Sequence, residues 1–410
     1  MIINADLHIH SKYSGATSKD MTLEMIAREA PLKGIQIMAT GDCLHPKWLE
    51  QIKSLKLVDE GTYELFQTRF VLSVEVEDKS RVHHLLYFPS VTSSESFREK
   101  IKPHSKNIDS DGRPNVALSG EDIAVFAYDV GALIGPAHAF TPWTSMYAYH
   151  ESLNQCYGEL AEYISFVELG LSADTEYADK IEELHRLTFL TNSDSHSPHP
   201  LRLAREFTRF KVKEPTFKEL AKAILRRGGN KPVLNVGLPP QEGKYNESAC
   251  LACHTHYSLD EANRRRWKCS CGKKIKKGVK DRIGEMATFD SPHHPNHRPE
   301  YIHLVPLAEI IAKAVGIQTP FAKTVMKRWG ELVKGFDNEI KVLLEVDYDD
   351  LSKVTTPAIV DAIQAFREQR IIIVPGGGGM YGQIELPGDD SILTVSIEPQ
   401  DSQTTLLDYA

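Results

Sequence analysis

Seven short apolar runs recur through the first 235 residues of the chain, and longer amphipathic stretches such as 23–30 and 178–187 lie between several of them. The runs span residues 2–9, 34–39, 70–76, 82–88, 132–134, 166–169 and 187–191. Strands that alternate with helices indicate parallel strands joined by crossover helices. So many repeats favour a barrel over a short open sheet. We therefore predict an α/β fold in which residues 1–235 form a β/α barrel.

The rest of the chain divides by composition. A chain of 410 residues is too long for one core, so we expect two or three domains. The proline- and glycine-containing stretch 232–245 reads as a linker, and residues 246–282 hold a cysteine cluster. Helical patterns over 304–315 and 322–333 and a strand over 371–374 predict an α+β C-terminal domain over 283–390. Residues 391–410 form a polar tail.

Composition limits the classes of function. The net charge of −8 is unlike that of a simple nucleic-acid binder, yet residues 246–282 hold ten basic and only four acidic side chains. No apolar run approaches the roughly 18 residues of a membrane helix, so we expect no membrane partner. The N-terminus lacks the basic start of a signal peptide. Six cysteines, four of them clustered, indicate a reducing, cytoplasmic setting and a metal site.

The sequence Asp6-Leu7-His8-Ile9-His10 is the central chemical signal. Alternate residues of a strand share a face, so Asp6, His8 and His10 point one way while Leu7 and Ile9 point into the packing. Two neutral imidazoles at this spacing can bind one transition metal. Alone, the pattern fits a pair of surface histidines equally well.

Metal-ligand residue types recur where the other apolar runs begin or end. The rim where strands of a β/α barrel end is where active sites assemble, so we predict that these side chains form one metal centre. Spacing leaves open whether His83 or His84 belongs to it. The candidates are Asp42, Glu75, His83 or His84, His138, Glu168, Asp194 and His196.

These residues resemble the PHP (polymerase and histidinol phosphatase) family, whose motifs cover about the first 210 residues. The resemblance rests on the D-x-H-x-H start, the "VEV" strand with Glu75, and the stretches "VHHL", "GPAHAF" and "SDSH". It implies a distorted β/α barrel with two or three divalent ions (Zn, Mg or Mn). Where many members have Thr-Asp-His, this chain has Thr40-Gly41-Asp42. The metal ligands it implies are His8, His10, Asp42, Glu75, His83, His138, Asp194 and His196.

The ligand types predict hydrolysis by a metal-activated water. A bridging carboxylate, for which Glu75 is our candidate, can hold two metal ions that lower the pKa of a bound water and neutralise charge on phosphate oxygens. We expect Asp194 to bind metal and orient that water, with His138 as a further catalytic ligand. The alternative to a catalytic centre is a degenerate barrel that binds no metal.

The second metal signal is a cysteine cluster. Cys250-x-x-Cys253 and Cys269-x-Cys271 resemble a zinc ribbon, although the second half is one residue shorter than usual. Four thiolates leave no open coordination position, so this zinc is predicted to be structural. The basic residues around it suit a phosphate backbone, or form only a solvated face.

A glycine-rich loop follows the strand predicted over 371–374. Glycines let backbone N–H groups approach a phosphate or a base, but the loop is no P-loop, and a flexible hairpin is an equal alternative. The candidate substrate-binding residues in it are Gly376, Gly377, Gly378, Gly379, Met380 and Tyr381.

The barrel motifs together with "HAFTPW", "ELGLSAD", "NSDSHSP", the cysteine cluster and "VPGGGGMYG" resemble the endonuclease Q family from residue 1 to about 387. The resemblance implies a DNA repair nuclease that cuts the phosphodiester 5′ to deaminated bases (uracil, hypoxanthine, xanthine) and abasic sites. It also implies a base pocket that involves Trp143, Glu168 and Ser172. A small-molecule phosphatase of the histidinol-phosphate type and a non-catalytic DNA-binding scaffold are the alternatives. The sequence assigns no replication or repair partner.

Overall fold

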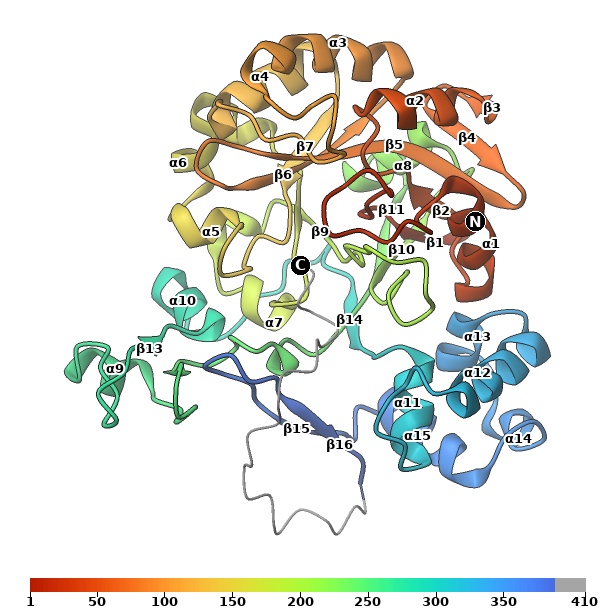
Figure 1. Ribbon diagram of the computed structural model, residues 1–410, viewed down its shortest axis with the longest axis vertical. Helices are drawn as coiled ribbons and strands as arrows, with labels where there is room; N and C mark the ends of the chain where they lie inside the picture. The colour runs from red at the N-terminus through yellow and green to blue at the C-terminus, as the bar shows by residue number, and fades with distance from the viewer. Residues whose placement is uncertain (388–410) are drawn as a thin grey trace.

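Residues 1–387 are described by the computed structural model, and the polar tail predicted over 391–410 lies outside them. Seven strands follow one another around a distorted barrel (Figure 1), and each overlaps one of the seven predicted apolar runs. They are β1 (Ile2–Asp6), β2 (Ile37–Ala39), β5 (Thr68–Glu77), β6 (His83–Phe88), β7 (Leu133–Pro136), β8 (Phe166–Glu168) and β9 (Thr188–Leu190).

The barrel closes through loop contacts rather than through one continuous sheet. Strands β1, β2, β5, β6 and β7 are paired in that order, and β8 and β9 form a separate parallel pair. Ala139 N donates to Glu168 O across the β7–β8 gap at 2.9 Å, and His10 N donates to Ser195 O across the β9–β1 gap at 2.9 Å. Both closing bonds lie beside candidate ligands, so closure of the barrel also places those ligands.

The prediction of uniformly parallel strands was wrong for β6, which pairs antiparallel with both β5 and β7. Only residues 78–82 join β5 to β6. A crossover to a parallel strand needs a dozen or more residues, whereas an antiparallel neighbour needs only a short turn. The short connection therefore fixes the reversed direction.

The sheet extends beyond the barrel on both sides. Strands β10 (Phe207–Lys211), β11 (Lys231–Gly237) and β14 (Glu300–His303) continue it from β1, and β4 (Thr62–Leu65) and β3 (Lys56–Asp59) continue it from β5. The predicted linker over 232–245 was wrong in its first part, because residues up to 237 belong to β11. Pro232 is tolerated there because it lies opposite Phe210, where the pairing register shifts.

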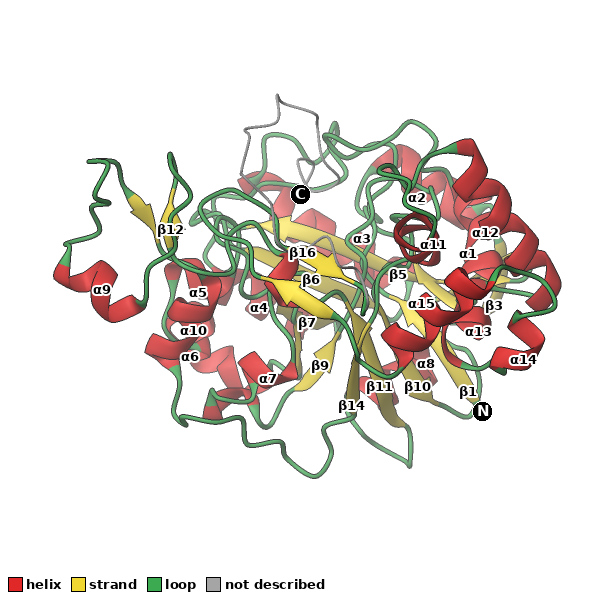
Figure 2. Ribbon diagram, turned by 90° about the horizontal axis from the view of Figure 1, so that it is seen from below, coloured by secondary structure: helices red, strands yellow, loops and turns green. Residues whose placement is uncertain are grey.

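Helices cover the outside of the barrel (Figures 1 and 2). The helix predicted over 178–187 was wrong: α7 ends at Ala178 and a 3₁₀ turn, η3, follows. The carboxylate of Asp179 instead accepts hydrogen bonds from Arg298, which lies far along the chain. The helices are α1 (Leu23–Lys33), α2 (Pro46–Lys53), α3 (Val91–Ile101), α4 (Gly120–Asp129), α5 (Met146–Tyr149), α6 (Leu153–Tyr157), α7 (Thr175–Ala178) and α8 (Phe217–Ile224), with the turns η1 (Lys102–His104), η2 (Gly158–Tyr163), η3 (Glu182–Leu184) and η4 (Pro240–Glu242).

Two smaller units lie on opposite sides of one end of the barrel in Figure 1. The first, which we call the cysteine module, spans residues 246–286. The second is a helical unit, and a hairpin of β15 and β16 lies between the two. The elements are β12 (Ala249–Cys250), α9 (Leu259–Arg264), β13 (Ile275–Lys276) and α10 (Val279–Met286) in the module, then α11 (Leu307–Ala314), α12 (Lys323–Phe336), α13 (Glu339–Leu344), α14 (Tyr348–Leu351) and α15 (Pro357–Arg367), then β15 (Ile372–Val374) and β16 (Gln383–Glu385).

A buried ion pair fixes the helical unit to the barrel. Lys33 Nζ, in the last turn of α1, lies 2.6 Å from Glu339 Oε1, in the first turn of α13, and both side chains are at most 2% exposed. Glu339 also accepts from the Leu307 N–H and the Trp329 indole, and Lys33 donates to Pro200 O. The pair is therefore well supplied with partners, as a buried charge requires. Within residues 1–387, no helix is both long and apolar enough to cross a membrane.

Candidate metal centre and nucleic-acid interface

The strand ends bring seven of the predicted ligands into one cluster. Three groups have ligand atoms within 4.8 Å of one another: His8, His10 and Glu75; His10, Asp194 and His196; and Glu75, His83 and His138. His8 and His10 follow β1, His138 follows β7, and Asp194 follows β9, so the rim of the barrel assembles residues that are up to 188 positions apart. Glu75 and His10 each belong to two groups, which makes the groups parts of one centre.

The Glu75 carboxylate lies between two groups of histidines. Its Oε1 atom is 2.7 Å from His83 Nδ1 and 2.9 Å from His138 Nε2. Its Oε2 atom is 3.4 Å from His10 Nε2. One oxygen toward each group is the arrangement of a bridging carboxylate.

The Asp194 carboxylate faces the two histidines of the first strand. Its Oδ1 atom lies 3.2 Å from His10 Nε2 and 3.5 Å from His8 Nε2. Asp194 has φ +47° and His138 has φ +29°, a left-handed conformation that ordinary side chains rarely adopt. Such strain persists only where the surrounding structure imposes it, and it concentrates at functional sites.

The donor set fits divalent metal ions. Within residues 1–387, His8 Nε2, His10 Nε2 and Asp194 Oδ1 are inaccessible to solvent and form no hydrogen bond, although they converge on one point. Buried polar atoms without partners are rare and need an explanation. Nitrogen and carboxylate ligands of this kind suit transition metals and zinc.

Asp42 and Glu168 lie behind the histidines rather than among the converging atoms. Asp42 Oδ1 is 3.2 Å from His10 Nδ1, and its Oδ2 accepts from the Ser11 N–H and the Ser14 hydroxyl. Glu168 Oε2 is 2.9 Å from His8 Nδ1. Carboxylates in this position fix the tautomer of a ligating histidine so that Nε2 faces the metal. The sequence predicted Asp42 as a ligand, and it predicted Glu168 both as a candidate for the metal centre and as part of the base pocket.

The structure places His83 and His84 in different surroundings. His83 faces Glu75, and its Nε2 lies 3.0 Å from Glu77 Oε2. His84, on the opposite face of β6, lies 2.9 Å from the Tyr157 hydroxyl and 3.3 Å from Asp78 Oδ2. Only His83 is therefore close to the other ligand candidates.

The buried carboxylates of the centre require positive charge close to them. Burial alone would raise the pKa of Glu75 and of Asp194, but neighbouring histidines hold both well below their ordinary values. Burial alone would lower the pKa of His8, yet Glu168 and Asp194 raise it to about 9. The carboxylates are thus ionised, and positive charge, as protons or as metal ions, must balance them.

A cleft opens directly on the centre. It is lined by Trp143, which is 49% exposed, by Ser172 and by Glu168, the three residues predicted for a base pocket. Arg113, which the sequence did not single out, also lines it and donates to Glu75 Oε2 at 3.2 Å. It stands in a loop with no strand pattern, so spacing held no signal for it. We call this space the Trp143 cleft.

The four clustered cysteines form a second candidate metal site. Their sulfur atoms all lie within 4.8 Å of one another, with Cys250 Sγ 3.5 Å from Cys271 Sγ and Cys253 Sγ 3.4 Å from Cys269 Sγ. All six cysteines of the chain lie within the described residues and are free. Four thiols at this separation fit one tetrahedral zinc, and the short Cys-x-Cys half does not prevent their convergence.

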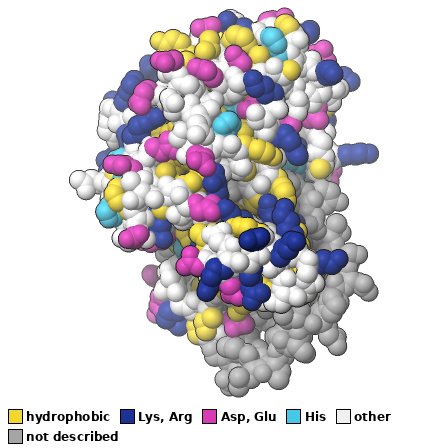
Figure 3. Space-filling view, turned by 90° about the vertical axis from the view of Figure 1, so that its left-hand side faces the viewer, with side chains coloured by type: hydrophobic (Ala, Val, Ile, Leu, Met, Phe, Trp, Pro, Cys, Tyr) yellow, Lys and Arg dark blue, Asp and Glu magenta, His cyan; other side chains and the backbone are white. Residues whose placement is uncertain are grey.

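Basic side chains surround the cysteine module. Arg264, Arg265, Arg266, Lys273 and Lys274 are exposed, and Figure 3 shows Lys and Arg gathered in the lower part of the face that it presents. The segment is therefore positively charged at its surface as well as in its sequence.

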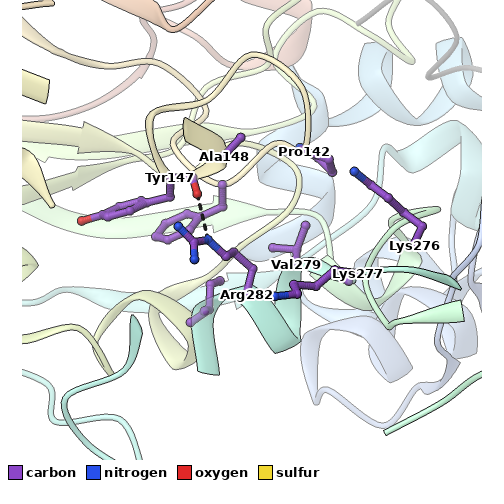
Figure 4. Close-up of a pocket in the computed structure, with 10 residues that line it drawn as sticks. Pro142, Tyr147, Ala148, Lys276, Lys277, Val279 and Arg282 are labelled. Carbon is purple, nitrogen blue, oxygen red and sulfur yellow. Dashed lines mark hydrogen bonds between the residues drawn. The ribbon is translucent and has the colours of Figure 1, made fainter. Parts of the chain in front are cut away.

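The cysteine module also contacts the barrel beside the Trp143 cleft. A second pocket, shown in Figure 4, lies between the loop after β7 and α10, and it shares Pro142 and Val279 with that cleft. Arg282 Nε donates to Tyr147 O at 3.1 Å across it. Lys276 lies over the ring of Trp143. The module thus forms one wall of the region in front of the metal centre.

The glycine-rich loop packs against the same region. Gly376 N donates to Gln241 O, and Glu247 N donates to Gly376 O. Gly378 and Gly379 have φ values of +62° and +95°, and a Cβ on Gly378 would meet Cys250 O at 2.4 Å, so the turn requires glycine there. Met380 is 44% exposed. The loop is therefore a tight turn on the module, with one apolar side chain at the surface.

Comparisons with known proteins agree with this architecture. Residues 306–370 match the family model described as the MJ0043 C-terminal domain. The uncharacterised protein MJ0043 of Methanocaldococcus jannaschii is 46% identical over 253 residues, which are 60% of this chain and 31% of that protein. The uncharacterised protein YqxK of Bacillus subtilis is 33% identical over 408 residues, which are 93% of this chain and 99% of that protein.

Two solved structures are similar over nearly the whole chain. The lesion-specific endonuclease PfuEndoQ from Pyrococcus furiosus has a TM-score of 0.91 and 49% identity, covering 95% of this chain and 96% of that one. Endonuclease Q in complex with a 27-mer duplex that has an abasic lesion at the active site has a TM-score of 0.88 and 49% identity, covering 95% and 97%. At this identity over at least 95% of each chain, the chain belongs to the endonuclease Q family.

Proposed function

We propose that this protein is a metal-dependent DNA repair endonuclease that hydrolyses the phosphodiester 5′ to deaminated bases (uracil, hypoxanthine, xanthine) and to abasic sites. The observation that carries the proposal is the Trp143 cleft, which opens directly on a buried His/Asp/Glu centre. The related endonuclease Q holds an abasic lesion at its active site. We expect the enzyme to act on DNA in the cytoplasm, and we assign it no replication or repair partner.

The chemistry rests on the residues of the centre. Two or three divalent ions, of Zn, Mg or Mn, held there would supply Lewis acidity and a water of lowered pKa. His8, His10, Glu75, His83, His138, Asp194 and His196 would hold them, with Asp42 and Glu168 as positioning residues. Arg113 faces the same space, and its guanidinium would neutralise charge that builds on the phosphate oxygens during attack.

The lesion must leave the base stack to reach the centre. Five of the seven proposed ligands are buried side chains at the barrel rim, and a duplex cannot bring a stacked base to that depth; the five are His8, His10, Glu75, His83 and His138. We therefore propose that the damaged nucleotide is extruded into the Trp143 cleft, where Trp143 would stack on it and Ser172 would contact it. Deaminated bases form weakened or mismatched pairs, so their extrusion costs less free energy than that of a normal base.

We propose that the glycine-rich loop fills the vacated position in the stack. Met380 is exposed at the tip, and Tyr381 follows it. Apolar side chains can wedge between base steps, and the glycines let the backbone approach. The double variant Met380→Ala/Tyr381→Ala should extrude less, read by a fluorescent base analogue opposite a deoxyuridine, and should cut more slowly. Wild-type extrusion in that variant would assign the wedge to another segment.

An incision assay tests the proposed function. Duplexes with a single deoxyuridine, deoxyinosine, deoxyxanthosine or abasic site are compared with the same duplex carrying an undamaged mismatch, with and without a chelator. We expect cleavage of the lesion strands only, with the lesion at the 5′ end of the downstream fragment. Equal cleavage of the mismatch control, or hydrolysis of histidinol phosphate with no incision, would overturn the proposal.

A further inference from the structure

Another cleft meets the metal centre at Asp194 and His196, and Asp194 is the one lining residue that it shares with the Trp143 cleft. It is lined by Ser18, Asp194, His196, Arg202, Arg205 and Phe321, and we call it the Arg202 cleft. Both clefts therefore border the metal centre. Phe321, which is 45% exposed and packs on His199 at a ring distance of 4.8 Å, comes from the helical unit. The barrel and the helical unit therefore form this cleft together.

The guanidinium of Arg202 lies in this cleft without a partner. Its backbone is held by a turn in which Arg202 N donates to His199 O at 2.8 Å, and the flanking Leu201 and Leu203 are buried. Its side chain is partly buried, yet it forms no hydrogen bond or ion pair with any residue of 1–387. By contrast, Arg205 Nε donates to Ser193 O at 3.0 Å. The backbone of Arg202 is thus held in place, while its guanidinium has no partner within residues 1–387.

The surroundings of Arg202 disfavour its charge. Burial and the neighbouring Arg205 lower its pKa to about 10, while Glu309 and Tyr381 act on it only at longer range. A partly buried charge without a counterion costs free energy that an external anion can recover. The planar guanidinium donates in a geometry that matches phosphate oxygens, so a phosphate is the anion it fits best.

We propose that the Arg202 cleft binds the phosphate of the cut strand that lies one nucleotide to the 5′ side of the scissile bond. The inference rests on the proposed function. The lesion nucleotide occupies the Trp143 cleft, and its 5′ phosphate lies at the metal centre. The upstream strand then passes from the centre into the Arg202 cleft, which Arg202 lines together with Asp194 and His196. Phe321 forms the apolar wall along which the upstream sugar passes.

The test couples a protein change to a change in one phosphate. Single-turnover incision and binding are measured for the wild type and Arg202→Gln on two deoxyuridine duplexes, one unmodified and one with a neutral methylphosphonate at the proposed phosphate. Each single change should weaken binding about tenfold, as expected for a hydrogen bond to a charged group. The combined change should weaken it little further, because both remove one contact.

Controls distinguish a direct contact between Arg202 and the phosphate from an effect of the substitution on folding. The exposed Arg28→Gln, and a methylphosphonate on the 3′ side of the lesion, should show no coupling to Arg202. Arg202→Gln should melt at or above the wild-type temperature, because it removes an unpaired charge. Additive losses, no loss, or a lowered melting temperature would overturn the inference while incision of lesion DNA continued. A wild type that does not cut lesion DNA would instead refute the proposed function, and the inference with it.

Discussion

The ammonium of Lys276 lies 3.8 Å from the ring centroid of Trp143, and this contact joins the cysteine module to the mouth of the Trp143 cleft. Lys276 belongs to β13, which pairs with β12, and β12 ends at Cys250, one of the four clustered cysteines. The Trp143 ring also meets Tyr245 edge-on, with a centroid separation of 5.9 Å. The cysteine site is thus connected to the wall of the cleft through the β12–β13 pairing and the contact of Lys276 with Trp143.

The variant Lys276→Met should weaken binding of lesion DNA while leaving zinc content unchanged. It keeps the aliphatic stem but removes a cation–π contact, which contributes about 0.5–2 kcal/mol. We expect KM to rise severalfold with kcat near the wild-type value, and Lys276→Arg to restore most of the loss. An unchanged KM in Lys276→Met would mean that Trp143 holds its position without this contact.

Replacing Cys250 and Cys253 by Ser should release one zinc ion per chain and loosen the module, because binding of a structural metal is coupled to local folding. Metal analysis measures the ion, and the salt dependence of DNA binding measures the module's contribution. The buried Cys156, changed to Ala in the barrel core, is the matched control and should retain the zinc. Full zinc content in the double variant would place the metal elsewhere.

Asp194→Asn should nearly abolish incision but spare DNA binding. Its carboxylate is the meeting point of His8 and His10. Loss of a charged metal ligand should slow single-turnover cleavage roughly a thousandfold, about 4 kcal/mol of transition-state stabilisation. Asp20→Asn, at an exposed site, serves as the control. Near-normal cleavage by a folded Asp194→Asn protein would remove this residue from catalysis.

Lys33→Met should destabilise the joint between the barrel and the helical unit by about 3–5 kcal/mol, because it leaves Glu339 as an unpaired buried charge. Urea unfolding measures the loss. The double variant Lys33→Met/Glu339→Gln should recover part of it, since the buried charge is gone while one acceptor remains for Leu307 or Trp329. Equal stability of the single variant and the wild type would show that the pair contributes nothing.

The stability of the protein should fall as pH rises from about 4.5 toward 8, in part through Glu206. Burial raises the pKa of this carboxyl to about 8 from an ordinary value of 4.5. The folded state therefore keeps a proton that the unfolded chain releases within this window, and stability decreases by about 1.4 kcal/mol per pH unit. Glu206→Gln, which can still accept from Leu238 N, should flatten that slope. An unchanged slope in the variant would assign the pH dependence to other groups.

The sequence predicted where strands and ligand-type residues lie, because apolar runs and the polar residues that end them are local patterns. It did not separate converging atoms from the carboxylates behind them: Asp42 and Glu168 also stand at strand ends, and only the fold shows that each faces the Nδ1 atom of a histidine. The antiparallel direction of β6 was not predicted either, because an apolar run does not indicate which way a strand runs relative to its neighbours.

Residues that act through contacts between distant segments left no pattern to find. Arg202 is one arginine among many in the sequence, and only the structure shows that it lies in a cleft without a partner within residues 1–387. Lys276 stood in a run of basic residues, and only its position over Trp143 distinguishes it. The strand β11 was mistaken for a linker because Pro232 lies where the pairing register shifts, an exception that composition cannot reveal.

Strands β11 and β14 are neighbours in the sheet, with Leu234 opposite Glu300 and Gly237 opposite His303, although the whole cysteine module separates them in the chain. During synthesis, β14 leaves the ribosome only after the module has been made. The outermost strand on this side of the barrel is therefore added last, and the module is tethered to the barrel at both ends before the helical unit exists. A module that failed to fold would stand between β11 and β14, two strands that must pair to complete the sheet.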